Sequence, residues 1–133
     1  MRPSLPALAL SLMLSLPAAA QDPGIESTIR GQIAAFLKDD FATAFTYASP
    51  TIRGLFGTPE NFGAMVRQGY PMVHRPAEVE LLDLREVAGA LWQRVRITDA
   101  AGGVHLLDYQ MVPGPEGWQI NAVQILRAPG VGV

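Results

Sequence analysis

Residues 91–112, LWQRVRITDAAGGVHLLDYQMV, decide the fold. In the first half, one set of side chains alternates with another: Leu91, Gln93, Val95 and Ile97 against Trp92, Arg94, Arg96 and Thr98. A period of two is that of a strand with one buried face. The glycines of residues 99–103 are typical of a hairpin loop. We therefore expect two antiparallel strands joined by this loop.

Two further strands are predicted beside this hairpin. Residues 79–87 precede the turn at Ala88 and Gly89, and residues 118–126 follow a Pro- and Gly-rich turn at 113–117. Each turn is short enough to join neighbouring antiparallel strands. The second half of the chain therefore predicts a four-stranded meander.

The first half has helical spacing instead. Apolar residues recur at steps of three and four from Ile25 to Lys38, which predicts one amphipathic helix. Shorter helices are expected after the N-cap residues Asp40, Ser49 and Thr58, because the last two are each followed by proline. Helices followed by a meander predict an α+β domain with the helices on one face of the sheet.

This order of elements resembles a known family. The residues that carry the resemblance are residues 32–40 (QIAAFLKDD), Ala44-Phe45, Ala48-Ser49-Pro50, residues 62–66 (FGAMV), Tyr70, Tyr109 and Trp118-Gln119-Ile120. The chain is similar to the bacterial domain of unknown function family 4864, within the nuclear transport factor 2-like superfamily. The resemblance implies a cone in which N-terminal helices pack in the concave face of a curved four-stranded antiparallel sheet. It implies no activity.

The N-terminus predicts a secretory signal peptide. Residues 1–20 hold one Arg, a Leu-rich run of about 12 residues and three consecutive alanines at 18–20. The Leu-rich run is too short to cross a bilayer. We expect cleavage between Ala20 and Gln21, a single domain at 21–128 and a flexible tail at 129–133. The expected location is periplasmic or secreted, without stable membrane association after cleavage. A retained N-terminal anchor is the alternative.

Composition excludes several classes of function. The 133 residues include 10 Lys and Arg against 12 Asp and Glu, so no basic surplus exists to neutralise a nucleic acid. The chain has no Cys, which excludes disulfides, thiolate metal sites and a cysteine nucleophile. His74, expected in a loop, and His105, expected on a strand, lack the spacing of metal ligands. We expect no metal and no cofactor.

Acid–base catalysis is the enzymatic alternative. Ketosteroid isomerase-like members of the superfamily keep a carboxylate base and Tyr or Asp donors inside an apolar cone, and that enzyme is a known case of pKa tuning. The residues that could be recruited here are Asp40, Tyr47, Tyr70, Asp108 and Tyr109. Their pattern does not match that enzyme cleanly, and Asp40 is better explained as a helix cap. We therefore assign no catalytic residue, and the sequence favours a protein that is not an enzyme.

A ligand pocket inside the cone is the main hypothesis. Apolar walls with a few polar tips are typical of a small-molecule site. The predicted pocket residues are Phe36, Phe45, Tyr47, Met65, Tyr70, Leu107 and Tyr109. The alternative is that these side chains fill the cone as ordinary core.

A protein interface on the outer face of the sheet is a further hypothesis. Trp92, Arg94 and Arg96 are expected to point away from the helices, and an exposed Trp between arginines suits an interface or a homodimer. The function expected from the sequence is thus a non-catalytic module that binds a small apolar ligand or a protein. A structural accessory protein of the cell envelope, acting through the sheet face, remains the other alternative.

Overall fold

The structure is a computed structural model that describes residues 21–126. Within them, five helices precede four strands: α1 (Pro23–Leu37), α2 (Phe41–Thr46), α3 (Pro50–Phe56), α4 (Pro59–Gly69), α5 (Pro71–His74), β1 (Pro76–Val87), β2 (Ala90–Asp99), β3 (Val104–Gly114) and β4 (Gly117–Leu126). The predicted signal peptide, its cleavage site at Ala20 and the predicted tail at 129–133 extend outside the described residues. None of the helices within 21–126 has the length and apolar character needed to span a membrane.

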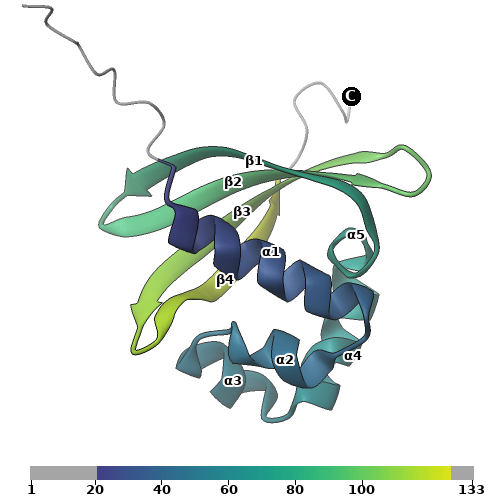
Figure 1. Cartoon of the computed structure of the whole chain (residues 1–133), viewed down its shortest axis with the longest axis horizontal. Coiled ribbons are helices and arrows are strands. Elements are labelled where there is room, and N and C mark those ends of the chain that lie inside the picture. Colours follow the sequence, from purple (N-terminus) through teal and green to yellow (C-terminus); the bar gives the residue numbers. More distant parts are fainter. Residues whose placement is uncertain (1–20, 127–133) are drawn as a thin grey trace, which may run out of the picture.

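The sheet is antiparallel in the order β1-β2-β3-β4. It curves around α1, which lies across its concave side, and α2 to α4 lie beneath α1 (Figure 1). The predicted α+β architecture is therefore confirmed: N-terminal helices pack in the concave face of a curved, open four-stranded sheet.

Irregular pairing accompanies the curvature. The β1–β2 register shifts between Leu81 and Leu84, and Met111 pairs with Ile120 whereas Gln110 pairs with Ala122. Asn121 is therefore an extra residue in β4. Such bulges bend a strand and increase its local twist.

The helices begin where the sequence predicts. Asp40 accepts a hydrogen bond from the Thr43 N–H, Ser49 from that of Ile52, and Thr58 from that of Asn61. A further short helix, α5, was not expected, and His74 is its last residue rather than part of a loop. A proline at the first position of α5 favours this turn because its fixed φ suits a helix start.

The turn between α1 and α2 is tied to α5. Asp39 has a φ of 55°, a left-handed conformation that Asp tolerates better than most residues. Arg75 donates to both oxygens of Asp39, at 3.0 and 2.9 Å, and also to the Phe36 carbonyl at 2.8 Å. These bonds fix the end of α1 against the start of β1.

The core lies between α1 and the concave face of the sheet. It contains the predicted α1 stripe and the inward side chains of the strands: Ile25, Ile29, Ile33 and Phe36 with Val95, Ile97, Leu107, Tyr109, Met111 and Ile120. Each of these side chains is buried. Val95 and Ile97 of β2 therefore face the core, as the alternation in residues 91–112 predicts.

Candidate functional site

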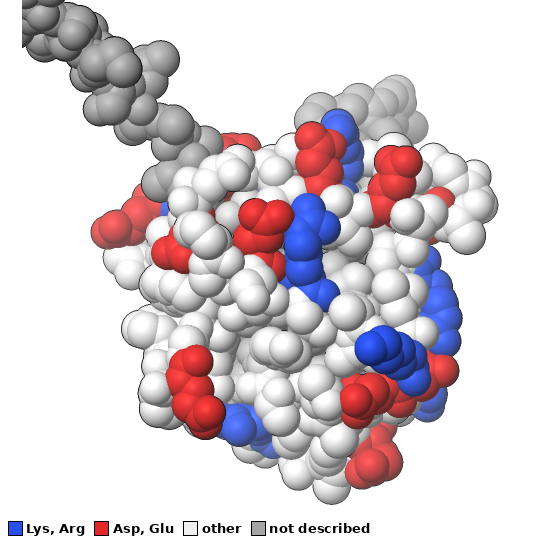
Figure 2. Space-filling view, viewed as in Figure 1, with Lys and Arg blue, Asp and Glu red and all other residues white. Residues whose placement is uncertain are grey.

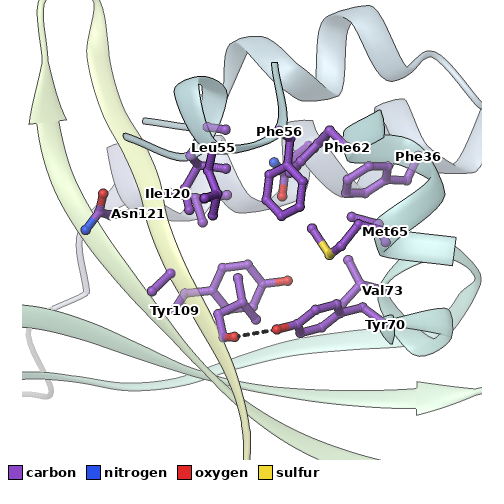
Figure 3. Close-up of a pocket in the computed structure, with 16 residues that line it drawn as sticks. Phe36, Leu55, Phe56, Phe62, Met65, Tyr70, Val73, Tyr109, Ile120 and Asn121 are labelled. Atoms are coloured by element: carbon purple, nitrogen blue, oxygen red, sulfur yellow. Dashed lines mark hydrogen bonds between the residues drawn. The ribbon is translucent and has the colours of Figure 1, made fainter. Parts of the chain in front are cut away.

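The core does not fill the cone beneath α3 and α4. A cavity of about 290 Å³ remains between these helices, α1 and strands β3 and β4 (Figure 3). Its lining is Gln32, Phe36, Ala48, Ile52, Leu55, Phe56, Phe62, Met65, Val66, Tyr70, Val73, Tyr109, Ile120, Asn121, Ala122 and Val123. None of these sixteen residues carries a charge. Leu55 is 72% exposed and marks the side on which the cavity reaches the surface.

The aromatic wall comes from neighbouring helices. Phe62 of α4 has its ring centroid 5.9 Å from those of Phe36 and Phe56, and 5.5 Å from that of Phe45. Aromatic pairs at such separations stabilise one another beyond their buried area. Phe36, Phe56 and Phe62 of this cluster line the cavity, and Phe45 packs against Phe62 without lining it.

Three of the four polar lining side chains are already hydrogen-bonded. Tyr70 donates to the Val123 carbonyl at 2.9 Å, and Gln32 donates to the Ala44 carbonyl at 3.1 Å. Asn121 accepts from Ser49 at 2.7 Å and donates to Gln110 at 2.9 Å. These hydrogen bonds hold the wall of the cavity together.

Tyr109 differs from those three. Its side chain is fully buried, and its hydroxyl has no hydrogen-bond partner among the described residues 21–126. The hydroxyl points from β3 into the space bordered by Met65 and Tyr70 (Figure 3). Arg53 Nε is also buried without a partner, but Arg53 does not line the cavity. Burial raises the pKa of the Tyr109 phenol far above its ordinary value, with a smaller contribution from Tyr70, so it stays neutral and protonated.

The predicted pocket residues divide into two groups. Phe36, Met65, Tyr70 and Tyr109 line the cavity. Phe45, Tyr47 and Leu107 are not among the lining residues.

Packing explains where those three lie. Phe45 packs against Phe62, with the two rings tilted by 58°. The Tyr47 hydroxyl lies so close to α1 that a Cβ added at Gly31 would be 2.6 Å from it. Leu107 is fully buried in the core under α1.

Several lining residues were not expected from the sequence. They come from α3, from α5 and from the last strand: Ile52, Leu55, Phe56, Val73, Ile120 and Val123. The apolar spacing of α3 was visible, but α3 buries none of its residues fully and so has no ordinary core pattern. Its apolar side chains face the cavity instead.

The acid–base alternative lacks its carboxylate at this site. Asp40 caps α2 and is exposed. Asp108 precedes Tyr109 but lies on the opposite face of the sheet, where Arg85 donates to its two oxygens at 2.8 Å each. No Asp or Glu lines the cavity within the described residues. Nor does any cluster of three or more His, Asp or Glu side chains in residues 21–126 have the arrangement of a metal site.

The three predicted interface residues share the outer face of the sheet. Arg94 lies opposite Asp108 in the sheet, and its guanidinium is 3.4 Å from that carboxylate. Arg96 pairs with Glu80, and Trp92 is half-buried beside them. Acidic and basic side chains lie close together on the surface shown in Figure 2. Both arginines are thus engaged within the chain.

The Asp108 carboxyl is stabilised in its ionised form. Burial alone would raise its pKa, but the hydrogen bonds from Arg85 and Arg94 outweigh that effect and hold the pKa below its ordinary value of 3.8. The cluster of Arg85, Arg94 and Asp108 therefore ties β1, β2 and β3 together on their outer face.

Comparison with known proteins gives one family. The model of the family described as "Domain of unknown function (DUF4864)" matches residues 18–133. Comparison with curated proteins found no match. The description of the family states no activity, so the site itself must support any functional proposal.

The unpaired hydroxyl gives a stability prediction. Tyr109→Phe removes a buried polar atom that has no partner, so the free energy of unfolding should stay the same or rise by up to about 1 kcal/mol. The matched control Tyr70→Phe loses the bond to Val123 and should cost about 0.5–1.5 kcal/mol. Urea unfolding measures both. A loss above about 2 kcal/mol for Tyr109→Phe would show that the hydroxyl is bonded within the protein.

The outer-face cluster gives a pH prediction. Asp108→Asn leaves two arginines without their counter-charge and should lower the free energy of unfolding by about 3 kcal/mol at neutral pH. Because the pKa of Asp108 is lower in the folded state, its contribution is present above pH 3.8 and is lost as the pH falls through the folded-state pKa. The difference in the free energy of unfolding between the wild type and Asp108→Asn should therefore disappear in acid.

Urea unfolding of both proteins from neutral pH down to about pH 2 tests this expectation. Glu80→Gln, which breaks the exposed pair with Arg96, is the control and should change stability by less than about 0.5 kcal/mol. A gap that stays constant with pH would mean that the carboxyl is not held in its ionised form by the arginines.

Proposed function

We propose that this chain, which belongs to the DUF4864 family of domains of unknown function, is a non-catalytic module that binds a small apolar molecule in the cavity between α3, α4 and β4. The observation that carries the proposal is an uncharged, mostly apolar cavity of about 290 Å³ beside the buried core. Sites for small molecules are concave and apolar with a few polar groups, at volumes of roughly 300–1,000 Å³.

The apolar lining supports this proposal. The cavity reaches the surface at Leu55, so its apolar wall is in contact with water when no ligand is bound. An apolar molecule that enters it removes this wall from water, which stabilises the complex by about 25 cal/mol for each Å² of apolar surface buried.

Membership of the nuclear transport factor 2-like superfamily is part of the proposal. It rests on the order of helices and strands and on the placement of the helices in a curved sheet. The ketosteroid isomerase-like alternative is weaker, because the cavity wall includes Tyr109 and Tyr70 but no carboxylate among the described residues. The homodimer through Trp92 is also weaker, because Arg94 and Arg96 already have partners within the chain.

Filling the cavity should abolish binding. Met65 points into it, so Met65→Trp should occupy part of the volume and weaken binding of N-phenyl-1-naphthylamine, a neutral dye that fluoresces in apolar sites, at least about tenfold. Gln68→Trp adds the same side chain on the exposed side of α4 and should leave binding unchanged. Fluorescence titration gives the affinities, and thermal unfolding checks that both variants fold. Equal binding by the three proteins, or saturable binding by none, would reject this site.

Export is the second part of the proposal. The single Arg and the short Leu-rich run of residues 1–20, followed by three consecutive alanines at 18–20, support cleavage by signal peptidase and a periplasmic or secreted location. A non-catalytic binding module in that location would act on molecules outside the cytoplasm.

The leader should be removed between Ala20 and Gln21. When the full chain is expressed in a bacterial host, N-terminal sequencing of the protein from the periplasm or medium should begin at Gln21. Ala20→Leu places a bulky side chain where the peptidase requires a small one and should leave the leader attached. An exported wild-type protein that still begins at Met1 would contradict this proposal.

A further inference from the structure

The chemistry of the ligand can be inferred from the unpaired hydroxyl of Tyr109. We propose that the cavity takes an uncharged molecule that presents a hydrogen-bond acceptor, such as a carbonyl, ester or ether oxygen, to Tyr109 Oη. This inference rests on the proposed binding function and adds the ligand class. It depends on one fully buried polar atom aimed into the cavity.

A buried hydroxyl without a partner is costly. Leaving such a group unsatisfied costs about 1–3 kcal/mol, and native proteins pair nearly all of their buried polar groups. Within the wall, Tyr70 is already bonded to Val123, and Gln32 to Ala44. The partner of Tyr109 Oη is therefore expected to come from the molecule that occupies the cavity.

A bound water fits this position less well than a ligand atom. A buried water is normally held by two to four polar partners. Next to Tyr109 Oη, the wall offers the sulfur of Met65 and the aromatic ring of Tyr70, whose hydroxyl proton is already donated (Figure 3). A ligand that brings one oxygen on an apolar body satisfies the hydroxyl and the apolar wall together.

The hydroxyl favours an acceptor rather than a donor. A phenolic O–H can donate one hydrogen bond, and this proton is unused in Tyr109. The pKa of that phenol is raised by burial, so the proton stays on the oxygen. Conjugation with the ring draws electron density from the oxygen and makes it a weaker acceptor than donor. A ligand acceptor therefore makes the stronger bond.

The lining excludes a charged ligand. Within residues 21–126, no Lys, Arg, His, Asp or Glu lines the cavity. A carboxylate or ammonium group would lose its hydration without gaining a counter-charge, which is strongly unfavourable. The volume of about 290 Å³ is at the lower end of the usual range for ligand sites and suits a small molecule of up to about three rings.

Three probes of nearly equal shape test the inference: acetophenone, α-methylstyrene and benzoate. They present a carbonyl oxygen, a methylene and a carboxylate at the same position on the ring. Affinities are measured by following backbone amide shifts in two-dimensional NMR, which detects weak binding. The proteins are the mature wild type, Tyr109→Phe and the control Tyr70→Phe, which removes a hydroxyl that is bonded to the backbone.

Tyr109→Phe should lower the affinity for acetophenone about fivefold and change the affinity for α-methylstyrene by less than about twofold, because only the ketone accepts the hydrogen bond. Tyr70→Phe should affect the two neutral probes equally. Benzoate should cause no saturable shifts at the cavity. The affinity of acetophenone relative to α-methylstyrene is thus the quantity that reports the bond.

Each other outcome has a distinct meaning. If Tyr109→Phe changes both neutral probes equally or neither of them, the hydroxyl does not recognise an acceptor. Binding of benzoate as tight as that of acetophenone would overturn the uncharged class. If N-phenyl-1-naphthylamine binds but none of the three probes does, the ligand class is wrong and the binding function stands. If that dye does not bind either, the proposed function itself fails.

Discussion

The attachment of the helices to the free edge of β4 is the constraint on which the rest of the structure depends. Ser49 N–H donates to the Ile120 carbonyl, and Ile120 N–H donates to the Tyr47 carbonyl, each at 2.8 Å, so residues 47–49 form a short parallel bridge with β4. Thr28 adds a bond to the Trp118 carbonyl and Tyr70 one to that of Val123. An edge strand leaves one row of backbone N–H and C=O groups unpaired. In β4 these groups bond to α1, to the 47–49 segment and to Tyr70 at the end of α4, and so hold these parts against the sheet.

The bulge at Asn121 allows these bonds to extend along β4. Carbonyl groups of a regular strand alternate in direction, so those of Trp118 and Ile120 point away from β3 together. The extra residue changes this alternation, and Val123 then directs its carbonyl toward Tyr70. The same bulge bends the strand locally. The cavity therefore lies where the strand is bent and the helices are fixed to its edge.

The sequence predicted the fold well because the fold depends on local signals. Alternation in 91–112, helical spacing after Ile25 and proline-supported caps at Ser49 and Thr58 each act over a few residues, and the structure agrees with them. The cavity wall was predicted only in part, since it depends on distances across the chain. Phe36 and Phe45 both look like core aromatic residues, but only Phe36 reaches the cavity. The contribution of β4 depends on the bulge at Asn121, which no pattern in the sequence indicates.

Strand alternation also explains why the site favours binding over acid–base chemistry. Asp108 and Tyr109 are adjacent, and a strand directs adjacent side chains to opposite faces. The carboxylate therefore meets Arg85 and Arg94 outside the sheet, while the phenol enters the apolar cone. Asp108 of β3 could face the cavity only if the register of this strand shifted by one residue. Such a shift would also turn Leu107 and Met111 out of the core. The packing that stabilises the sheet thus keeps ionised groups of β3 out of the cavity and places a neutral phenol in its wall.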